Sequence, residues 1–230
     1  MTTEIKTAAE PRVPLTRERV LTAAIALADR DGAEALSMRK LGVELGVEAM
    51  SLYNHVSNKD DLLNGVVDTM VGEITLVEPR SDWKSAVREQ VLNARAVLSS
   101  HKWAPGVFES RKTMTPTMMR YFDRLGGLFF EGGVSVDLMH HAMHVLGSRM
   151  LGFVQELYND SEELEDSPEV RAMMEHMSTE YPNIARLAME IQHDDDSIVG
   201  KGCDDDVEFV FALDILLDGI ERKHIAETTN

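Results

Sequence analysis

The segment SMRKLGVELGVEAMSLYNHV, residues 37–56, carries the pattern that decides the fold. Ser37 has the side chain of a helix N-cap, and Gly46 ends the helix that starts there after about two turns. A further short helix is expected over residues 48–55, with Leu52 on its buried face. Two short helices joined by a tight glycine turn are typical of a helix-turn-helix, which holds its second helix in the major groove of DNA.

The side chains of this segment strengthen that interpretation. Hydroxyl, amide and imidazole groups lie close together on the second helix, and such groups hydrogen-bond base edges and phosphate oxygens. Arg39, Lys40 and Lys59 add cations at three points around it. Helix spacing alone is weak evidence, because short helix pairs are common in all-α proteins. The combination of spacing and side chains favours DNA binding.

Outward from this segment, helical signals continue in both directions. Residues 1–15 contain two prolines and little apolar periodicity, so we expect a flexible arm. Thr16 is placed to cap a first helix that Gly32 follows. Ser57 with Asp60 resembles a capping box at the start of a longer fourth helix. One face of that helix carries four apolar residues, Leu63, Val66, Met70 and Ile74.

The remainder reads as a second helical body. Helix starts are marked by Asp82, by Thr115 with Pro116, by Ser135 and by Ser167 with Pro168, and a break is expected near Pro182. Residues 193–206 read as an acidic loop. No stretch shows sustained period-two alternation, so no sheet is expected. The sequence therefore predicts an all-α protein of about ten helices.

The last helix, from about Asp206, is apolar nearly all round. Its apolar residues are Val207, Val210, Leu213, Leu217 and Ile220 on one side, with Phe211 and Ile215 on others. A helix of this kind needs two partners, and another subunit is a candidate for one of them.

Charge is distributed unevenly along the 230 residues, whose net charge is −17. Residues 1–60 hold eight Lys and Arg against nine Asp and Glu, whereas the remainder has a net charge of −16. The acidic remainder would be repelled by DNA and would orient the first segment toward it. The chain has a single cysteine, Cys203, and no apolar run long enough to span a membrane. Both features favour a cytoplasmic protein.

A family resemblance starts from the same residues. Gly46-Val47, the segment SLYNHV at residues 51–56, Lys59 and Leu62-Leu63 resemble the signature of the TetR family of bacterial regulators, most clearly over residues 16–67. Further on, Trp83 and residues 98–101 and 209–219 are similar to the ligand domain of the tetracycline-repressor branch.

The resemblance implies a repressor that binds a palindromic operator as a homodimer and is released by a small-molecule inducer, with no cofactor. It divides the chain into the arm (1–15), a three-helix DNA-binding domain (16–60) and a larger ligand-binding and dimerisation domain (61–230). An activator is not excluded. Together with the residue pattern it gives the candidate DNA contacts Ser37, Arg39, Lys40, Ala49, Met50, Ser51, Tyr53, Asn54, His55 and Lys59.

Departures from the tetracycline repressor concern both of its sites. Asn54 stands where that repressor has tryptophan, so we expect a different operator. Phe108 stands where it has a metal-chelating histidine, which argues against a magnesium–tetracycline ligand. Glu48 is a poor N-cap for the helix that follows it.

Fourteen methionines favour either an adaptable ligand cavity or an irregular core. The resemblance tips the balance toward a cavity, because the same middle helices enclose the ligand in relatives. The candidate wall residues are Trp103, Phe108, Met118, Phe122, Met143, Arg149, Met150 and Phe153.

Other functions compete with that of a DNA-binding repressor. His140 and His144 lie one helical turn apart and could bind a metal, although such histidines more often line a pocket or a helix interface. An enzyme is disfavoured because no nucleophile elbow, glycine-rich phosphate loop or HExxH pattern is present. A helical adaptor that has lost DNA binding is a third possibility, which a gel shift would separate from the first.

Overall fold

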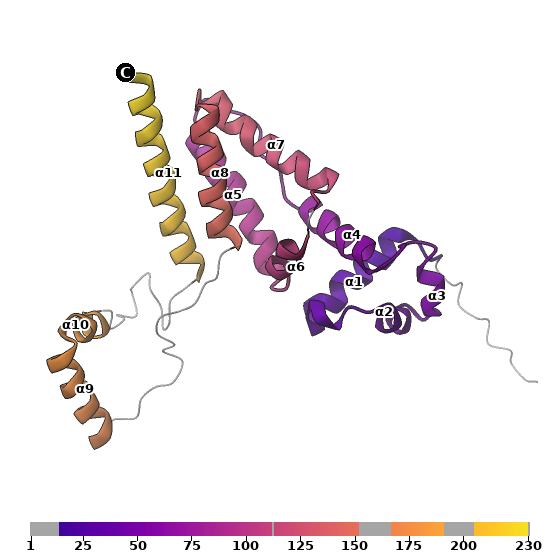
Figure 1. Cartoon of the computed structure of the whole chain (residues 1–230), viewed down its shortest axis with the longest axis horizontal. Helices are drawn as coiled ribbons and strands as arrows, with labels where there is room; N and C mark the ends of the chain where they lie inside the picture. The colour runs from indigo at the N-terminus through magenta and orange to yellow at the C-terminus, as the bar shows by residue number, and fades with distance from the viewer. Residues whose placement is uncertain (1–13, 112, 152–166, 191–204, 230) are drawn as a thin grey trace, which may run out of the picture. The chain divides into compact units, whose positions relative to one another are not determined.

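The computed structural model describes residues 14–111, 113–151, 167–190 and 205–229. These residues form eleven α-helices and one 3₁₀ helix without any strand, which confirms the predicted all-α class (Figure 1). The chain divides into two compact units, Met1–Val134 and Ser135–Asn230. Most of the predicted arm, the acidic loop up to residue 204, Phe153 and Cys203 lie outside the described residues.

The first unit contains α1 (Arg17–Asp31), η1 (Ala33–Ala35), α2 (Met38–Leu45), α3 (Ala49–Leu52), α4 (Lys59–Gly72), α5 (Trp83–Ser100), α6 (Ala104–Ser110) and α7 (Pro116–Glu131). Predicted caps are confirmed at four of these helices. The side chains of Thr16, Asp82 and Thr115 accept hydrogen bonds from the backbone N–H groups at the third residue of α1, α5 and α7. A fourth predicted cap, Ser37, does the same for α2. The short helix α6 was not predicted.

Helix α4 is the central element of this unit, because it packs against α1, α5, α6 and α7. Leu63, Val66 and Met70 are buried along it, as the apolar stripe predicts. The helix ends at Gly72, so Ile74 is buried beyond its end rather than on it. One helix therefore contacts both α1 and the helices α5 to α7 that follow.

The start of α4 differs from the sequence prediction. Asn58 is the N-cap, with its side-chain oxygen 2.8 Å from the backbone nitrogen of Asp61. Ser57 instead donates its backbone N–H to the Asp61 carboxylate at 2.8 Å. The Asp61 carboxylate, three residues beyond Asn58, thus accepts the reciprocal bond expected of a capping box one residue later than predicted, and the donor is the N–H of Ser57 rather than that of the N-cap residue.

The second unit contains α8 (Val136–Leu151), α9 (Pro168–Glu180), α10 (Pro182–Glu190) and α11 (Asp205–Thr229). Helix α8 packs against α11, and α9 against α10. Pro182 begins α10 immediately after Tyr181, the C-cap residue of α9, which explains the predicted break. No described helix has both the length and the apolar character needed to cross a membrane.

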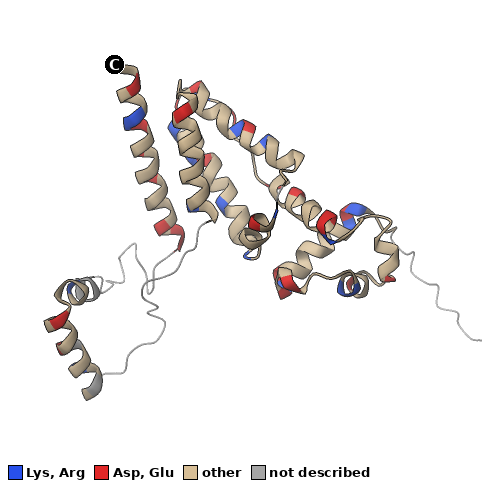
Figure 2. Ribbon diagram, viewed as in Figure 1, with Lys and Arg blue, Asp and Glu red and all other residues tan. Residues whose placement is uncertain are grey.

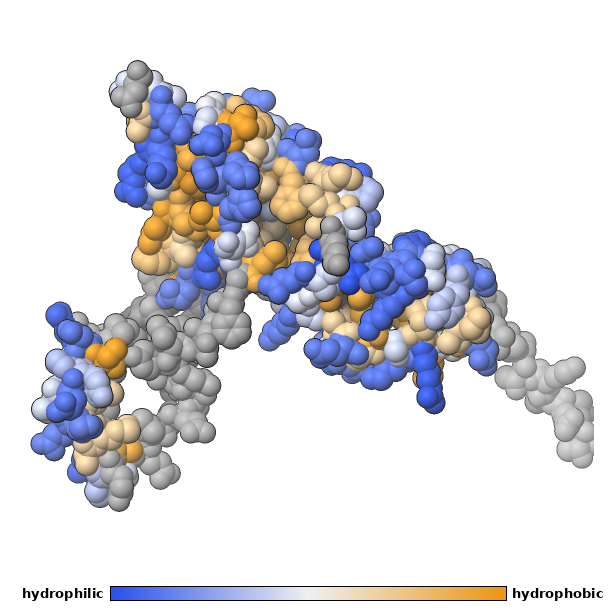
Figure 3. Space-filling view, in the orientation of Figure 1, coloured by the Kyte–Doolittle hydropathy of each residue, from blue (hydrophilic) through white to orange (hydrophobic). Residues whose placement is uncertain are grey.

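Helix α11 buries one face and exposes another. Phe209, Leu213, Leu217 and Ile220 are its buried residues, while the predicted core positions Val207 and Val210 are only half-buried. Phe211 and Ile215 are 63% and 51% exposed. Figure 3 shows orange hydrophobic surface beside blue hydrophilic residues in the region of α11.

Candidate nucleic-acid interface

The turn between α2 and α3 depends on two glycines. Gly46 adopts a left-handed backbone with φ of 65°, a region that residues with a side chain rarely occupy, and so ends α2. At Gly42, an added Cβ would lie 2.9 Å from the carbonyl oxygen of Val47 and 3.2 Å from the nitrogen of Ala49. The two helices therefore approach as closely as a glycine contact permits, which confirms the predicted helix-turn-helix geometry.

The recognition helix is shorter than the sequence predicts. Helix α3 covers only Ala49–Leu52, whereas a helix over residues 48–55 was expected. Beyond Leu52, the N–H groups of residues 53–55 bond to carbonyls three residues earlier, as in a tightened 3₁₀ turn. Glu48 makes no side-chain cap, in line with its poor capping character. A four-residue helix depends on tertiary packing, which Leu52 supplies because it is fully buried.

The candidate DNA contacts mostly face solvent. Seven of them are exposed, namely Ser37, Arg39, Lys40, Met50, Tyr53, Asn54 and Lys59, and three are half-buried, namely Ala49, Ser51 and His55. Figure 2 shows the basic residues of α2 in blue. Burial of Leu52 beneath this set fixes the backbone while the polar side chains stay available for an external partner.

An apolar residue joins these polar groups. Ser37, Arg39 and Lys40 line a shallow surface depression together with Val43, which is 79% exposed. Met50 on α3 is 75% exposed. Exposed apolar side chains on a helix-turn-helix suit contact with the methyl group of thymine. Val43 was not among the predicted contacts, although its position two residues after the buried Leu41 places it off the buried stripe.

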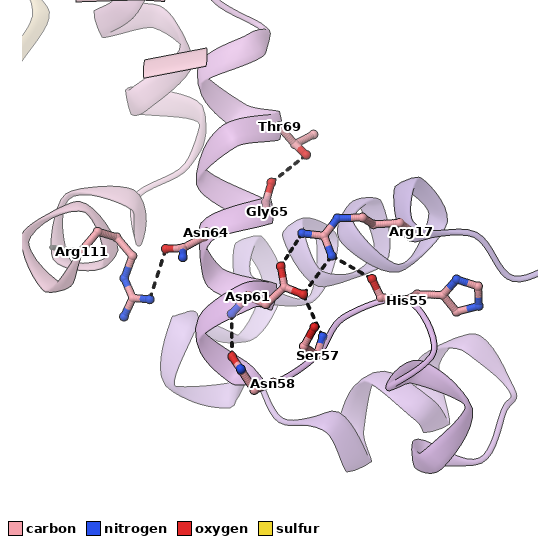
Figure 4. Close-up of polar contacts among 9 residues, drawn as sticks. All are labelled: Arg17, His55, Ser57, Asn58, Asp61, Asn64, Gly65, Thr69 and Arg111. Carbon is pink, nitrogen blue, oxygen red and sulfur yellow. Dashed lines mark hydrogen bonds and ion pairs between the residues drawn. The ribbon is translucent and has the colours of Figure 1, made fainter. Parts of the chain in front are cut away.

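An ion pair holds the end of the recognition segment against two other helices (Figure 4). Arg17, at the start of α1, lies 2.6 and 3.1 Å from the two carboxylate oxygens of Asp61 on α4. The same guanidinium donates to the backbone carbonyl of His55 at 2.8 Å. Arg17 and Asp61 therefore set where the segment after α3 lies, and neither was predicted from the sequence.

The charge of Asp61 is stabilised by this arrangement. The hydrogen bond from Arg17 and the backbone N–H of Ser57 lower the pKa of Asp61 from 3.8 to about 2, and the same carboxylate raises the pKa of Arg17. A second pair, Arg30 with Glu44 at 3.0 Å, joins α1 to α2 and lowers the pKa of Glu44. Ion pairs thus connect α1 to both neighbours of the recognition segment.

Helix α6 is attached to the DNA-binding helices at both ends. At its start, the indole N–H of Trp103 donates to the Asp29 carboxylate on α1 at 2.6 Å, and Nδ1 of the buried His101 lies 2.8 Å from the same oxygen. At its end, Arg111 lies 3.0 Å from the Asp60 carboxylate on α4. Movement of α6 would therefore be transmitted to α1 and α4.

The candidate ligand-wall residues are divided between the two units. Trp103 and Phe108 on α6, and Met118 and Phe122 on α7, belong to the first unit. Trp103 lies beside a cleft that Lys59 and Lys102 also line, so its indole faces α1. The second unit carries Met143, Arg149 and Met150 on α8, all half-buried.

Arg149 is positioned by Phe209, which was not among the predicted site residues. Its guanidinium lies 5.3 Å from the ring centroid of Phe209, a cation–π contact between α8 and α11. Because Phe209 is buried, this contact helps to hold the two helices together.

Comparison with known families matches both parts of the chain. Residues 20–66 match the model described as bacterial regulatory proteins, tetR family, and residues 77–224 match the tetracyclin repressor-like C-terminal domain. The HTH-type transcriptional repressor DrrR1 of Streptomyces coeruleorubidus is 30% identical over 223 residues, covering 92% of this chain and 79% of that protein.

A second relative matches over a shorter length. An HTH-type transcriptional regulator of Saccharopolyspora erythraea is 40% identical over 106 residues, which cover 46% of this chain and 45% of that protein. Among solved structures, ActR of Streptomyces coelicolor in complex with actinorhodin has a TM-score of 0.70 and 26% identity. That match covers 92% of this chain and 99% of ActR.

Proposed function

This chain belongs to the tetR family of bacterial regulatory proteins, and from that premise we propose that it is a ligand-responsive repressor. It binds a palindromic operator as a homodimer and leaves it when a small-molecule inducer binds. Residues 16–60 carry the DNA contacts, and residues 61–230 carry the ligand site and the dimer interface.

The observation that carries the proposal is the recognition segment from Ala49 to His55. Leu52 anchors it from below while Met50, Tyr53 and Asn54 point into solvent. Arg39, Lys40 and Lys59 supply cations for phosphate oxygens on either side of the bases that these side chains would read. This division between positioning cations and base-reading groups is what operator recognition requires.

Dimerisation is supported by the apolar surface of the second unit. Phe211, Ile215 and Ile225 are exposed on α11, and Val136 and Val145 are exposed on α8. Leaving such residues in water loses the free energy of their burial, about 25 cal/mol per Å² of apolar surface. A second copy would cover the same patch on both chains, and its two-fold symmetry would match a palindromic operator.

Release by a small molecule is supported by relatives and by the attachment of α6. ActR has been solved with actinorhodin, and the DrrR1 relative is named as a repressor. In this chain, α6 contacts α1 through Trp103 and α4 through Arg111. An inducer that shifted α6 would therefore alter the placement of the helix-turn-helix, with DNA and ligand opposing each other by the same coupling free energy.

The proposal is tested by a mobility-shift assay with the DNA upstream of the chain's own gene and a scrambled duplex of equal length. We expect a shift of the upstream DNA at lower protein concentration than of the scrambled DNA, and weaker binding as salt rises. Equal shifts of the two duplexes would contradict operator recognition. No shift, together with capture of a protein partner, would support the adaptor alternative instead.

A further inference from the structure

Three histidines lie on the exposed side of α8. His140, His141 and His144 are all exposed, and His140 is in ring contact with both of the others. The ring centroids of His140 and His144 lie 4.7 Å apart at 74°, and those of His140 and His141 lie 5.6 Å apart. Residues four apart share one helix face, so the 140–144 pair is the one whose rings project together.

The spacing of this pair fits chelation of one metal ion. Imidazole nitrogens bind zinc at about 2.0–2.1 Å in a tetrahedral arrangement, which places the centroids of two bound rings about 5 Å apart. The observed separation of 4.7 Å is within a small rotation of that value. The helix therefore holds the two rings at about the centroid separation that a shared cation needs, before any cation binds.

The ring nitrogens of the pair are also available. Among the described residues, no hydrogen bond or ion pair engages the imidazole of His140 or His144. His141 differs, since its Nε2 lies 3.8 Å from the Asp137 carboxylate one turn earlier. Metals bind the neutral imidazole nitrogen, so an exposed ring without a competing partner is the better ligand.

We propose that His140 and His144 form a binding site for a borderline divalent cation of the zinc type. Within the described part of the chain, no group of three or more His, Cys, Asp or Glu side chains could hold a metal ion, so the pair supplies two ligands and water the others. The net charge of −17 attracts cations to the molecule. The pair lies on the same helix as Val136 and Val145 of the proposed dimer surface, and its test is a zinc titration that does not depend on operator binding.

The test is calorimetric titration of Zn²⁺ into the full chain carrying no affinity tag. We expect one Zn²⁺ per chain, and an affinity at least about tenfold weaker in His140→Ala and in His144→Ala, because a single imidazole loses the effective concentration of its neighbour. His141→Ala is the matched control and should keep the wild-type affinity. Alanine favours the helix at these exposed positions, so the variants should fold.

A second readout separates this pair from zinc bound elsewhere. Zn²⁺ should raise the thermal unfolding midpoint of the wild type and of His141→Ala, but not that of the His140→Ala/His144→Ala double variant. Equal zinc affinities of the wild type and the three single variants, or loss of zinc binding only in His141→Ala, would overturn the proposal. DNA binding by the zinc-free protein is measured separately, so failure of this site leaves the operator test untouched.

Discussion

Lys59 and Asn54 are expected to play different roles in operator recognition. Lys59→Ala should lower affinity for every sequence and reduce the salt slope by about one unit per half-site, since it removes the proposed phosphate contact. Asn54→Ala should relax the preference at one base position, at a cost of roughly 1–3 kcal/mol. Anisotropy titrations on operator and random duplexes at several salt concentrations measure both effects. Equal losses on both duplexes for both variants would contradict the assignment.

The Arg17–Asp61 pair predicts a dependence of stability on acid. Folding lowers the pKa of Asp61 from 3.8 to about 2, so the contact stabilises the protein fully above about pH 4 and is lost as the pH falls through about 2. Asp61→Asn should therefore lose stability at neutral pH, and its difference from the wild type should shrink across that interval. Urea unfolding at a series of pH values measures the difference.

The control for this experiment is Asp123→Asn, which alters an exposed carboxylate on α7. It should leave the acid profile of the wild type unchanged. A stability difference between wild type and Asp61→Asn that stays constant from pH 2 to pH 5 would show that the Arg17 contact does not hold the charged carboxylate.

At the scale of helices, local signals predicted most starts and the apolar stripes predicted most buried faces. Thr16, Ser37, Asp82 and Thr115 each cap a helix where the sequence indicates one, because a hydroxyl or carboxylate before an apolar-periodic run acts within a few residues. These positions need no knowledge of tertiary structure.

Elements decided by long-range contacts were predicted less well. Helix α3 ends at Leu52, and the turn after it leads to the His55 carbonyl, which accepts from Arg17, 38 residues away in sequence. Helix α6 is only seven residues long, and its N-cap residue is Trp103, whose indole is held by Asp29, 74 residues earlier. Sequence periodicity does not contain such contacts, so both the shortened helix and α6 required the structure.

The contact of Asp29 with α6 gives a prediction at this scale. Asp29→Ala removes the acceptor for the Trp103 indole and the partner of the buried His101, leaving two polar groups unpaired. We expect a loss of about 1–3 kcal/mol in urea unfolding and greater acrylamide quenching of Trp103 fluorescence. Asp31→Ala, which breaks an ion pair of the exposed Arg30, should cost less stability than Asp29→Ala.

Equal stability and equal quenching in Asp29→Ala and Asp31→Ala would show that Asp29 does not hold α6 against α1. The comparison is informative because the two carboxylates lie two residues apart at the end of α1.

At the scale of the whole molecule, the buried and the exposed positions of α11 give separate predictions for folding and for the proposed dimerisation. Leu213 and Leu217 are fully buried within the chain, so a charge at either position should unfold the protein. Phe211→Glu and Ile215→Glu alter exposed positions and should keep the helical circular dichroism while lowering the sedimenting mass from twice 25.7 kDa to a single chain. A Phe211→Glu/Ile215→Glu double variant that still sediments as a dimer would place the interface elsewhere.

The proposed homodimeric repressor is tested most directly by the mass of the protein–operator complex, measured by sedimentation equilibrium. The DNA is a labelled palindromic duplex taken from the upstream DNA that the protein shifts. For the wild type, we expect two chains of 25.7 kDa on one duplex. For Phe211→Glu/Ile215→Glu, we expect a single chain on that duplex, and only at much higher protein concentration. A stable complex of one wild-type chain with the full palindrome would contradict a homodimeric repressor.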